Sequence, residues 1–359
     1  LRCLRCCSHQ ADRRESVGAM RIEEYVSLAS LTTFHIGGEA RFFIEAHTEK
    51  DVEAAIVHAR EHSLPLYPLG GGSNVLVSDE GVEGVVLKIA LGDIVFEDES
   101  TDTLLIAGAG ARWEDVVDAA AARGLFGIEN LAGIPGTIGG AAVQNIGAYG
   151  AGLADTFAYA DVIDSATGGA RRVERAEAAF AYRTSFFKAH RELIIMRVAL
   201  RLRKSAMPNV AYPDLVRAQA AGAPLATPSE IARAIRAIRA AKFPQHADEG
   251  TAGSFFKNPV ISRERADELA KRFPEVPQFV QKDGAVKIPL AWLLDHALAL
   301  KGFSKGSVRL YEKQPLVIVA RAGARAEEVD AFANEVAERV FALTGITIER
   351  EVETFGVAQ

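Results

Sequence analysis

Several features are scarce in this 359-residue sequence, and each absence excludes a class of protein. All three cysteines fall within the first seven residues, so the rest of the chain can hold no disulfide framework and no cysteine-based zinc site. No stretch reaches 18 uninterrupted apolar residues, which argues against a membrane-spanning helix. The net charge of −6 lacks the basic excess of a dedicated nucleic-acid binder. What remains is ordinary globular composition, 49% hydrophobic and 25% charged.

Four well-known catalytic and nucleotide-binding motifs are also missing. No G-x-G-x-x-G occurs at a predicted strand-to-helix turn, and no G-x-x-x-x-G-K-[ST] occurs, so a Rossmann nicotinamide site and a P-loop are both unsupported. The zinc-protease pattern H-E-x-x-H and the serine-hydrolase pattern G-x-S-x-G are absent too. We therefore expect no metal site, no nucleic-acid partner and no obligate protein partner.

The N-terminus differs from the rest of the chain. The sequence opens with Leu1, and ordinary protein pattern begins only after Met20. We interpret residues 1–20 as a non-native or disordered extension, with translation starting at Met20. The apolar core of a secretory signal is missing, and with a cysteine-free body this predicts a reducing compartment.

Short apolar strands alternate with helices along the chain, without a run of regular βαβ units. Apolar and β-branched patterns predict strands over 40–47, 84–90, 103–110, 160–165 and 191–204. Helical spacing predicts helices over 51–63, 113–124 and 326–343. This mixture predicts an α+β fold rather than a doubly wound sheet.

The second half of the chain begins with a change in composition. Residues 205–227 carry three prolines and are interpreted as a linker or mobile loop. Thr227, Pro228 and Glu230 form a capping box that predicts a helix ending before Pro244. A terminal strand is predicted over 346–356, which would place its alternating glutamates on one face.

Two segments concentrate glycine beyond what turns require. Residues 70–74 read GGGSN, directly after a predicted strand, and consecutive glycines can turn successive N–H groups toward one anion. Residues 133–150 read GIPGTIGGAAVQNIGAYG, where small side chains let a flat ligand lie against the backbone. A lone glycine triplet is often a flexible hairpin tip. Together, however, the two segments predict a dinucleotide site, with pyrophosphate on the first and an aromatic ring on the second.

These two segments resemble the flavin-binding domain of the vanillyl-alcohol-oxidase superfamily, also called the PCMH type. Three further motifs, AYRTSFFK (181–188), AGSFFKNP (252–259) and IEREVETFG (348–356), resemble those of the UDP-N-acetylenolpyruvoylglucosamine reductase family. The resemblance implies an FAD-binding domain over 21–204 and a smaller α+β substrate-binding domain over 205–359.

The resemblance also implies an activity. Members use NADPH and FAD to reduce the enolpyruvyl ether of UDP-N-acetylglucosamine to UDP-N-acetylmuramate, a cytoplasmic step in peptidoglycan precursor and cell-wall synthesis that supports cell shape and division. The FAD is expected to be non-covalent, because the body has no cysteine and the GGGSN loop has no histidine. Two alternatives stay open: another non-covalent FAD oxidoreductase of the wider superfamily, and a flavin or nucleotide-sugar binding protein without catalysis.

Site residues follow from the same motifs. The resemblance implies that Arg183 stabilises a developing enolate, that Ser254 donates a proton and that Glu351 assists the acid. From general patterns alone, these would be a surface ion-pair residue, a turn serine and one of three glutamates at alternate positions. The implied cofactor-binding residues are Gly70, Gly71, Gly72, Ser73, Asn74, Ile134, Pro135, Gly136, Thr137, Gly140, Gly147 and Tyr182. The implied substrate-binding residues are Tyr149, Tyr212, Arg239, Lys242, Asn258 and His296, the last at a position where some relatives carry glutamine.

Overall fold

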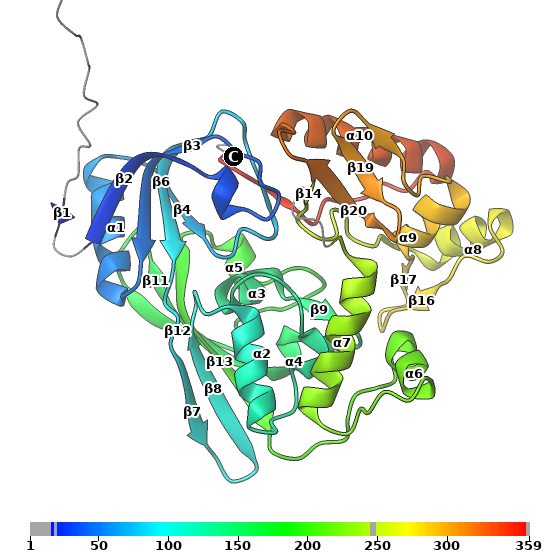
Figure 1. Cartoon of the computed structure of the whole chain (residues 1–359), viewed down its shortest axis with the longest axis horizontal. Coiled ribbons are helices and arrows are strands. Elements are labelled where there is room, and N and C mark those ends of the chain that lie inside the picture. The colour runs from blue at the N-terminus through cyan, green and yellow to red at the C-terminus, as the bar shows by residue number, and fades with distance from the viewer. Residues whose placement is uncertain (1–15, 18–19, 245–248, 357–359) are drawn as a thin grey trace, which may run out of the picture.

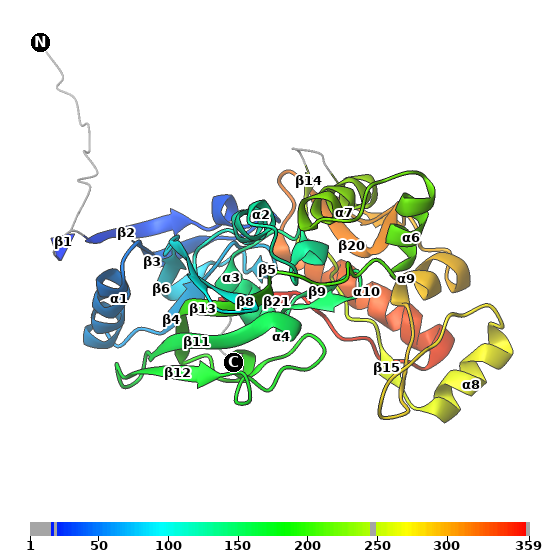
Figure 2. The ribbon, with the colours of Figure 1, turned by 90° about the horizontal axis from the view of Figure 1, so that it is seen from below.

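The computed structural model describes residues 16–17, 20–244 and 249–356 (Figure 1). The expectation for residues 1–20 falls almost entirely outside this part of the chain. Within it, two lobes lie side by side, one built by the first two sheets and one by the C-terminal sheet and its helices (Figures 1 and 2).

The first sheet combines antiparallel and parallel pairing. Its strands, in spatial order, are β1 (Ser16–Val17), β2 (Met20–Ser27), β3 (Glu39–Ala46), β6 (Val82–Ile89) and β4 (Leu66–Leu69). Strands β3, β6 and β4 run parallel. Their carboxyl ends therefore meet at one edge, where ligands of open α/β sheets bind. Helix α1 (Glu49–Glu61) packs on this sheet and begins with a capping box at Thr48.

The second sheet is antiparallel throughout. Its strands, in spatial order, are β12 (Ala170–Glu174), β11 (Phe157–Asp164), β13 (Leu193–Arg203), β8 (Asp102–Gly108) and β7 (Ile94–Asp98). Shorter elements of this lobe are η1 (Ala29–Leu31), α2 (Trp113–Ala122), η2 (Glu129–Leu131), α3 (Ile138–Gln144), β9 (Gly147–Ala148), β10 (Ala151–Gly152), α4 (Leu153–Thr156) and α5 (Phe186–Ala189). One apolar core joins both sheets through buried residues such as Ile44, Leu105 and Trp113.

The C-terminal lobe has its own core. It contains the sheet β14 (Glu249–Gly250), β20 (Gln314–Arg321), β19 (Val308–Tyr311) and β18 (Ser304–Lys305), and the sheet β15 (Val260–Ile261), β17 (Val286–Lys287) and β16 (Phe279–Val280). Its helices are α8 (Arg263–Arg272), α9 (Leu290–Trp292), the π-helical turn Leu293–Ala297 and α10 (Ala326–Thr344). Phe255, Phe256 and Phe332 are fully buried at its centre.

Two helices that follow the first lobe in sequence also pack on it. Helices α6 (Pro213–Ala220) and α7 (Pro228–Lys242) bury Leu215, Ile231 and Ile235 in the first core. The apolar core therefore changes after α7. The domain boundary that the sequence predicts between residues 204 and 205 stays a prediction. It lies before α6 and α7, whereas the change from one apolar core to the other follows α7.

The last strand returns to the first lobe. Strand β21 (Glu353–Phe355) pairs in parallel with β5 (Val75–Val77), directly after the first glycine segment, and the two lie together in Figure 2. The backbone N–H of Glu353 donates to the carbonyl of Asn74 at 3.0 Å. The C-terminal segment is thereby fixed beside the glycine loop.

Most predicted elements are confirmed within two or three residues at each end. The capping box of α7 is confirmed as well, and α10 ends at Gly345 in the left-handed conformation that favours glycine. Two predictions are wrong. The linker 205–227 contains α6, whose first turn starts at Pro213, and the terminal strand is limited to three residues because the segment before it packs as an irregular coil against Phe255. In the described ranges, no helix is long and apolar enough to cross a membrane.

The C-terminal core should depend strongly on Phe332, which stacks on Phe303 at 5.4 Å between ring centroids. We expect Phe332→Ala to lower the free energy of unfolding of this lobe by roughly 3–5 kcal/mol, because it removes buried surface and leaves a cavity. Phe341 lies on the same helix but is 56% exposed, so Phe341→Ala should change stability by less than about 0.5 kcal/mol. Urea unfolding of both variants measures the difference, and equal losses would contradict this packing.

Candidate active site

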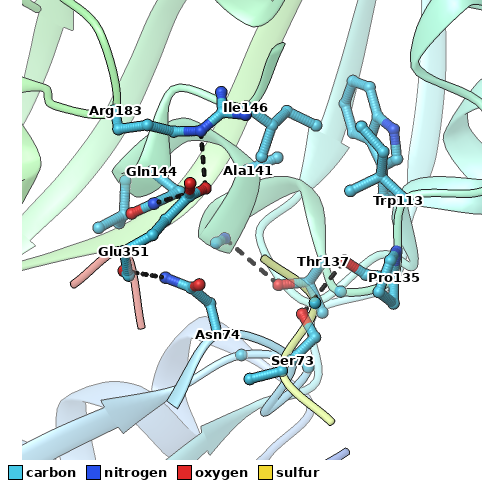
Figure 3. A pocket seen from close by; sticks show the side chains of 18 of the residues that line it. Ser73, Asn74, Trp113, Pro135, Thr137, Ala141, Gln144, Ile146, Arg183 and Glu351 are labelled. Atoms are coloured by element: carbon cyan, nitrogen blue, oxygen red, sulfur yellow. Dashed lines mark hydrogen bonds and ion pairs between the residues drawn. The ribbon is translucent and has the colours of Figure 1, made fainter. Parts of the chain in front are cut away.

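A cavity of about 920 Å³ opens between the first lobe and the returning C-terminal segment. It is lined by both glycine segments, the turn at 181–184, the start of the 252–259 segment and the segment around Glu351. Figure 3 shows the side chains of Arg183 and Glu351 pointing toward each other, with Asn74 of the first glycine loop beside Glu351. Every predicted site residue except His296 lines this cavity.

The two glycine loops touch each other through their backbones. A Cβ built on Gly71 would lie 2.5 Å from the Cα of Gly136, and one built on Gly70 would lie 2.8 Å from the hydroxyl of Thr137. The hydroxyl of Ser73 donates to the carbonyl of Pro135 at 3.1 Å (Figure 3). No side chain fits between the loops where Gly71 meets Gly136, so the contact there is made by backbone alone.

Helix α3 connects the second glycine loop to the polar side of the cavity. The hydroxyl of Thr137 accepts from the N–H of Gly140 at 3.4 Å and caps the helix. The helix ends at Asn145, whose φ of 47° is left-handed. The side-chain amide of Asn145 donates to the carbonyl of Ala181 at 2.7 Å. Sequence reasoning missed α3, because its two glycines lower helix propensity.

Arg183 lies in a tight turn that its own side chain stabilises. Ala181 and Thr184 exchange two backbone hydrogen bonds of 3.1 Å, so Tyr182 and Arg183 are the central residues. Of these two central residues, only Arg183 has a positive φ, 53°. This is the pattern of a type II turn, in which the second central position favours glycine. This backbone conformation costs a non-glycine residue roughly 1–3 kcal/mol of stability, and it persists only where surrounding contacts stabilise it. The guanidinium does so by donating to the carbonyl of Gly147 at 2.9 Å.

Arg183 and Glu351 form a partly buried ion pair. The Nε of Arg183 lies 2.6 Å from Oε1 of Glu351, and their side chains are 20% and 12% exposed. The Nε–H makes no aligned hydrogen bond to the described residues, so the contact is mainly electrostatic. The amide of Gln144 donates to the same carboxylate oxygen at 3.3 Å, and Asn74 donates to the Glu351 backbone carbonyl at 3.2 Å (Figure 3).

Next to the Arg183–Glu351 pair lie two more cations, Lys188 and Arg191, with Glu353 between them. The ammonium of Lys188 donates to the side-chain carbonyl of Gln144 at 3.0 Å and lies 2.9 Å from Glu353. Because Lys188 occupies that oxygen, the amide of Gln144 must present its N–H₂ to Glu351. Arg191 lies 3.6 Å from Glu353. The three glutamates thus take different places: Glu351 and Glu353 line the cavity, while the exposed Glu349 pairs with Lys257 outside it.

Ser254 and Glu351 are brought together by the backbone of Phe255. The N–H of Phe255 donates to the carbonyl of Leu316 on β20, and its carbonyl accepts from the N–H of Glu351, both at 2.8 Å. The ring of Phe255 is buried, which anchors the segment and leaves Ser254 on the cavity side. The Ser254 hydroxyl makes no hydrogen bond to another residue that the structure describes. Farther along the segment, Asn258 donates to the hydroxyl of Tyr182 at 3.2 Å from its backbone.

Two cations from α7 lie at another side of the cavity. Arg239 donates to the carbonyl of Gly133 at 2.8 Å and also contacts the Tyr149 hydroxyl. Burial raises the pKa of Tyr149 and lowers the pKa of Arg239. Tyr149 packs edge-to-face on Tyr212 at 5.2 Å. Lys242 forms an ion pair with Asp214, a buried carboxylate on α6.

Sequence reasoning missed several polar cavity residues, namely Gln144, Lys188, Arg191, Asp214, Lys287, Gln314 and Glu353. The ammonium of Lys287 lies 5.2 Å from the centre of the Tyr182 ring. Burial, with a smaller effect from the charge of Arg183, lowers the pKa of Lys287. A lone lysine between apolar residues carries no spacing signal that would have identified it.

His296 does not reach this cavity. It lies in the π-helical turn, exposed, with its ring stacked on Trp292 at 5.0 Å and 4° between planes. The substrate contact expected for His296 is therefore not supported by its position.

Comparison with known proteins identifies both parts of the chain. Residues 40–174 match the family described as an FAD binding domain, and residues 245–355 match the C-terminal domain of UDP-N-acetylenolpyruvoylglucosamine reductase. A Pseudomonas aeruginosa protein with that enzyme's name is 38% identical over 336 residues, 93% of this chain and 98% of the relative. A Chromobacterium violaceum protein of the same name is 37% identical over 331 residues, covering 91% and 96%.

A solved structure agrees with these matches. The crystal structure of UDP-N-acetylenolpyruvylglucosamine reductase from Thermus caldophilus has a TM-score of 0.64 to this chain, with 27% identity, and covers 93% of this chain and 99% of that one. The expected fold class, an α+β chain with an FAD-binding domain followed by a smaller domain, is confirmed. The two glycine loops meet backbone to backbone and line the cavity, and the backbone N–H groups of residues 70–73 donate to no other described residue, which fits the FAD that this domain binds.

The contact between the glycine loops should not tolerate a methyl group. We expect Gly71→Ala to destabilise the protein by about 1–3 kcal/mol and to abolish FAD retention, because its Cβ would meet the Cα of Gly136. Gly92→Ala is the control, since a Cβ there meets only one atom, at 3.8 Å. The flavin-to-protein absorbance ratio after purification measures the effect, and a normal ratio in Gly71→Ala would contradict this geometry.

Proposed function

Because this chain belongs to the UDP-N-acetylenolpyruvoylglucosamine reductase family of flavin-dependent oxidoreductases, we propose that it uses NADPH and bound FAD to reduce UDP-N-acetylglucosamine enolpyruvyl ether to UDP-N-acetylmuramate. Non-covalent FAD, a role in peptidoglycan precursor synthesis and a cytoplasmic location belong to the same proposal.

One observation supports this activity most directly. Arg183, Ser254 and Glu351 come from three segments far apart in sequence, yet all three line one cavity whose wall is the pair of glycine loops. A cation, a hydroxyl and a carboxylate beside a flavin-binding wall suit the reduction of a double bond conjugated to a carboxylate.

The reaction adds one hydride and one proton across a carbon–carbon double bond. The two glycine loops would hold FAD, which would supply hydride transfer from the reduced nicotinamide to the terminal vinyl carbon. The electron pair of the double bond then moves toward the neighbouring carbon and into the substrate carboxylate as an enolate. The protein must therefore stabilise this negative charge and protonate that carbon.

Arg183 suits the first task. A guanidinium remains charged at any working pH and holds a carboxylate through two parallel hydrogen bonds. Its turn and the Gly147 carbonyl fix its direction before substrate arrives. Preorganised charge of this kind needs no rearrangement as the enolate develops.

Ser254 and Glu351 suit the second task. A serine hydroxyl is a weak acid, so nearby cations must favour its alkoxide as the proton leaves, and Arg183 and Lys287 line the same cavity. Glu351 is tied to the Ser254 segment through Phe255 and to Arg183 by the ion pair. It would orient the enol or assist proton donation.

The substrate diphosphate requires cations, which Arg239 and Lys242 provide on one side of the cavity. Tyr149 and Tyr212 pack beside them, and Asn258 lines the cavity near Tyr182. Burial lowers the pKa of Lys287, which also lines the cavity. These residues would hold the nucleotide-sugar while Arg183 holds its carboxylate.

Anaerobic half-reactions test the proposal. The yellow holoenzyme is reduced with one equivalent of NADPH, and the enolpyruvyl UDP-sugar is then added. Return of the flavin absorbance, with UDP-N-acetylmuramate detected by mass spectrometry, supports the assignment. Re-oxidation only by oxygen would instead indicate an oxidase of the wider flavin superfamily, and failure of the flavin to be reduced would indicate a binding protein.

Ser254→Ala should separate the two half-reactions. We expect reduction of FAD by NADPH to remain near wild type, while re-oxidation by the enolpyruvyl substrate slows about a hundredfold or more, because the proton donor is lost. Stopped-flow absorbance measures each rate separately. Ser304→Ala, at an exposed position of the same lobe, is the control and should behave like wild type. Normal re-oxidation in Ser254→Ala would overturn this role.

A further inference from the structure

A lysine lies directly behind the first glycine loop. Lys88 is the second-last residue of β6, the strand between β3 and β4, and pairs with Leu69 at the end of β4. Its ammonium donates a hydrogen bond to the carbonyl of Gly70, the first residue of the loop. It thus contacts the loop from the carboxyl end of the parallel strands.

The charge of Lys88 is only partly exposed to solvent. Val86, two residues before Lys88 in the regular part of β6 and so on the same face of the sheet, belongs to a small apolar cluster. Burial lowers the pKa of this ammonium, and the carboxylate of Glu45, its neighbour on β3, opposes that shift. A partly desolvated cation is costly unless it is hydrogen-bonded, and the Gly70 carbonyl provides that bond.

Holding one carbonyl sets the direction of the next N–H. The peptide bond is planar and trans, so the Gly70 carbonyl and the Gly71 N–H point in opposite directions. The Gly71 N–H therefore points away from Lys88. The backbone N–H groups of residues 70–73 donate no hydrogen bond to any other described residue, although all four residues line the cavity. Four unpaired donors in succession form a binding surface for an anion.

We propose that Lys88 is a positioning residue for the cofactor: its bond to the Gly70 carbonyl fixes the first peptide of the loop so that the loop N–H groups bind the FAD diphosphate. This proposal rests on the binding of FAD by this domain. The positive charge behind the loop adds attraction for the diphosphate across the peptide. Lys88 itself need not touch the ligand.

Lys88→Met tests this role, because methionine keeps the length of the side chain but has neither charge nor donor. Apo-protein is titrated with FAD and, separately, with ADP, which has the diphosphate but no flavin ring. We expect the Kd of each ligand to rise about tenfold or more, as for loss of one hydrogen bond to a charged group. Lys88→Arg, which keeps the charge and donors, should recover most of the affinity.

Thermal unfolding of the apo-protein separates this role from a merely structural one. Lys88→Met removes a partly buried charge from an apolar face, so the apo Tm should stay the same or rise while ligand affinity falls. Lys50→Met, at an exposed position of α1, is the control and should change neither quantity. The proposal is overturned if Lys88→Met binds both ligands within twofold of wild type, or if affinity falls only together with the apo Tm. A wild-type protein that binds no FAD would reject the proposed function instead.

Discussion

The cavity depends on the contact between two backbones. Gly71 and Gly136 approach so closely that neither loop can carry a side chain at this point. Each loop therefore limits the position of the other. Helix α3 follows the second loop, and Asn145 at its end donates to Ala181 in the turn that carries Arg183. The returning strand β21 is fixed beside the first loop because Glu353 donates to the carbonyl of Asn74. The glycine loops and the polar side chains of the cavity are therefore parts of one connected structure.

Charge in the cavity is arranged so that cations outnumber the carboxylates that face them. Arg183 and Lys188 each contact a glutamate, yet Lys287 adds positive charge without a carboxylate partner among the described residues. A substrate with a carboxylate and a diphosphate would thus find a positive potential. The molecule as a whole carries a net charge of −6. Local arrangement, rather than overall composition, makes the site suitable for an anion.

The sequence predicts those features that depend on local chemistry. The capping box at Thr227 and the five strands predicted between residues 40 and 204 follow from residues near one another, and they are confirmed. The candidate site residues were found in another way, through the resemblance of three motifs to a known family, because general patterns alone would make Arg183, Ser254 and Glu351 ordinary residues. What the sequence could not predict depends on distant contacts: α3 is stable only by packing, and the Glu351 segment is bent by hydrogen bonds to Phe255. The resemblance gave no orientation for His296, whose ring stacks on Trp292 and does not line the cavity.

The pairing of β21 with β5 also has a consequence for the order of folding. Gln144 and the Glu351 carboxylate, which meet in the cavity, are separated by 207 positions in the chain. Contacts of such separation carry a large loop-closure entropy and form late. Both glycine loops, in contrast, belong to the first lobe and can meet as soon as its sheets form. A partly folded chain should thus be able to bind FAD before the C-terminal segment brings Glu351 into the cavity. The bound FAD would then stabilise the lobe on which β21 must dock.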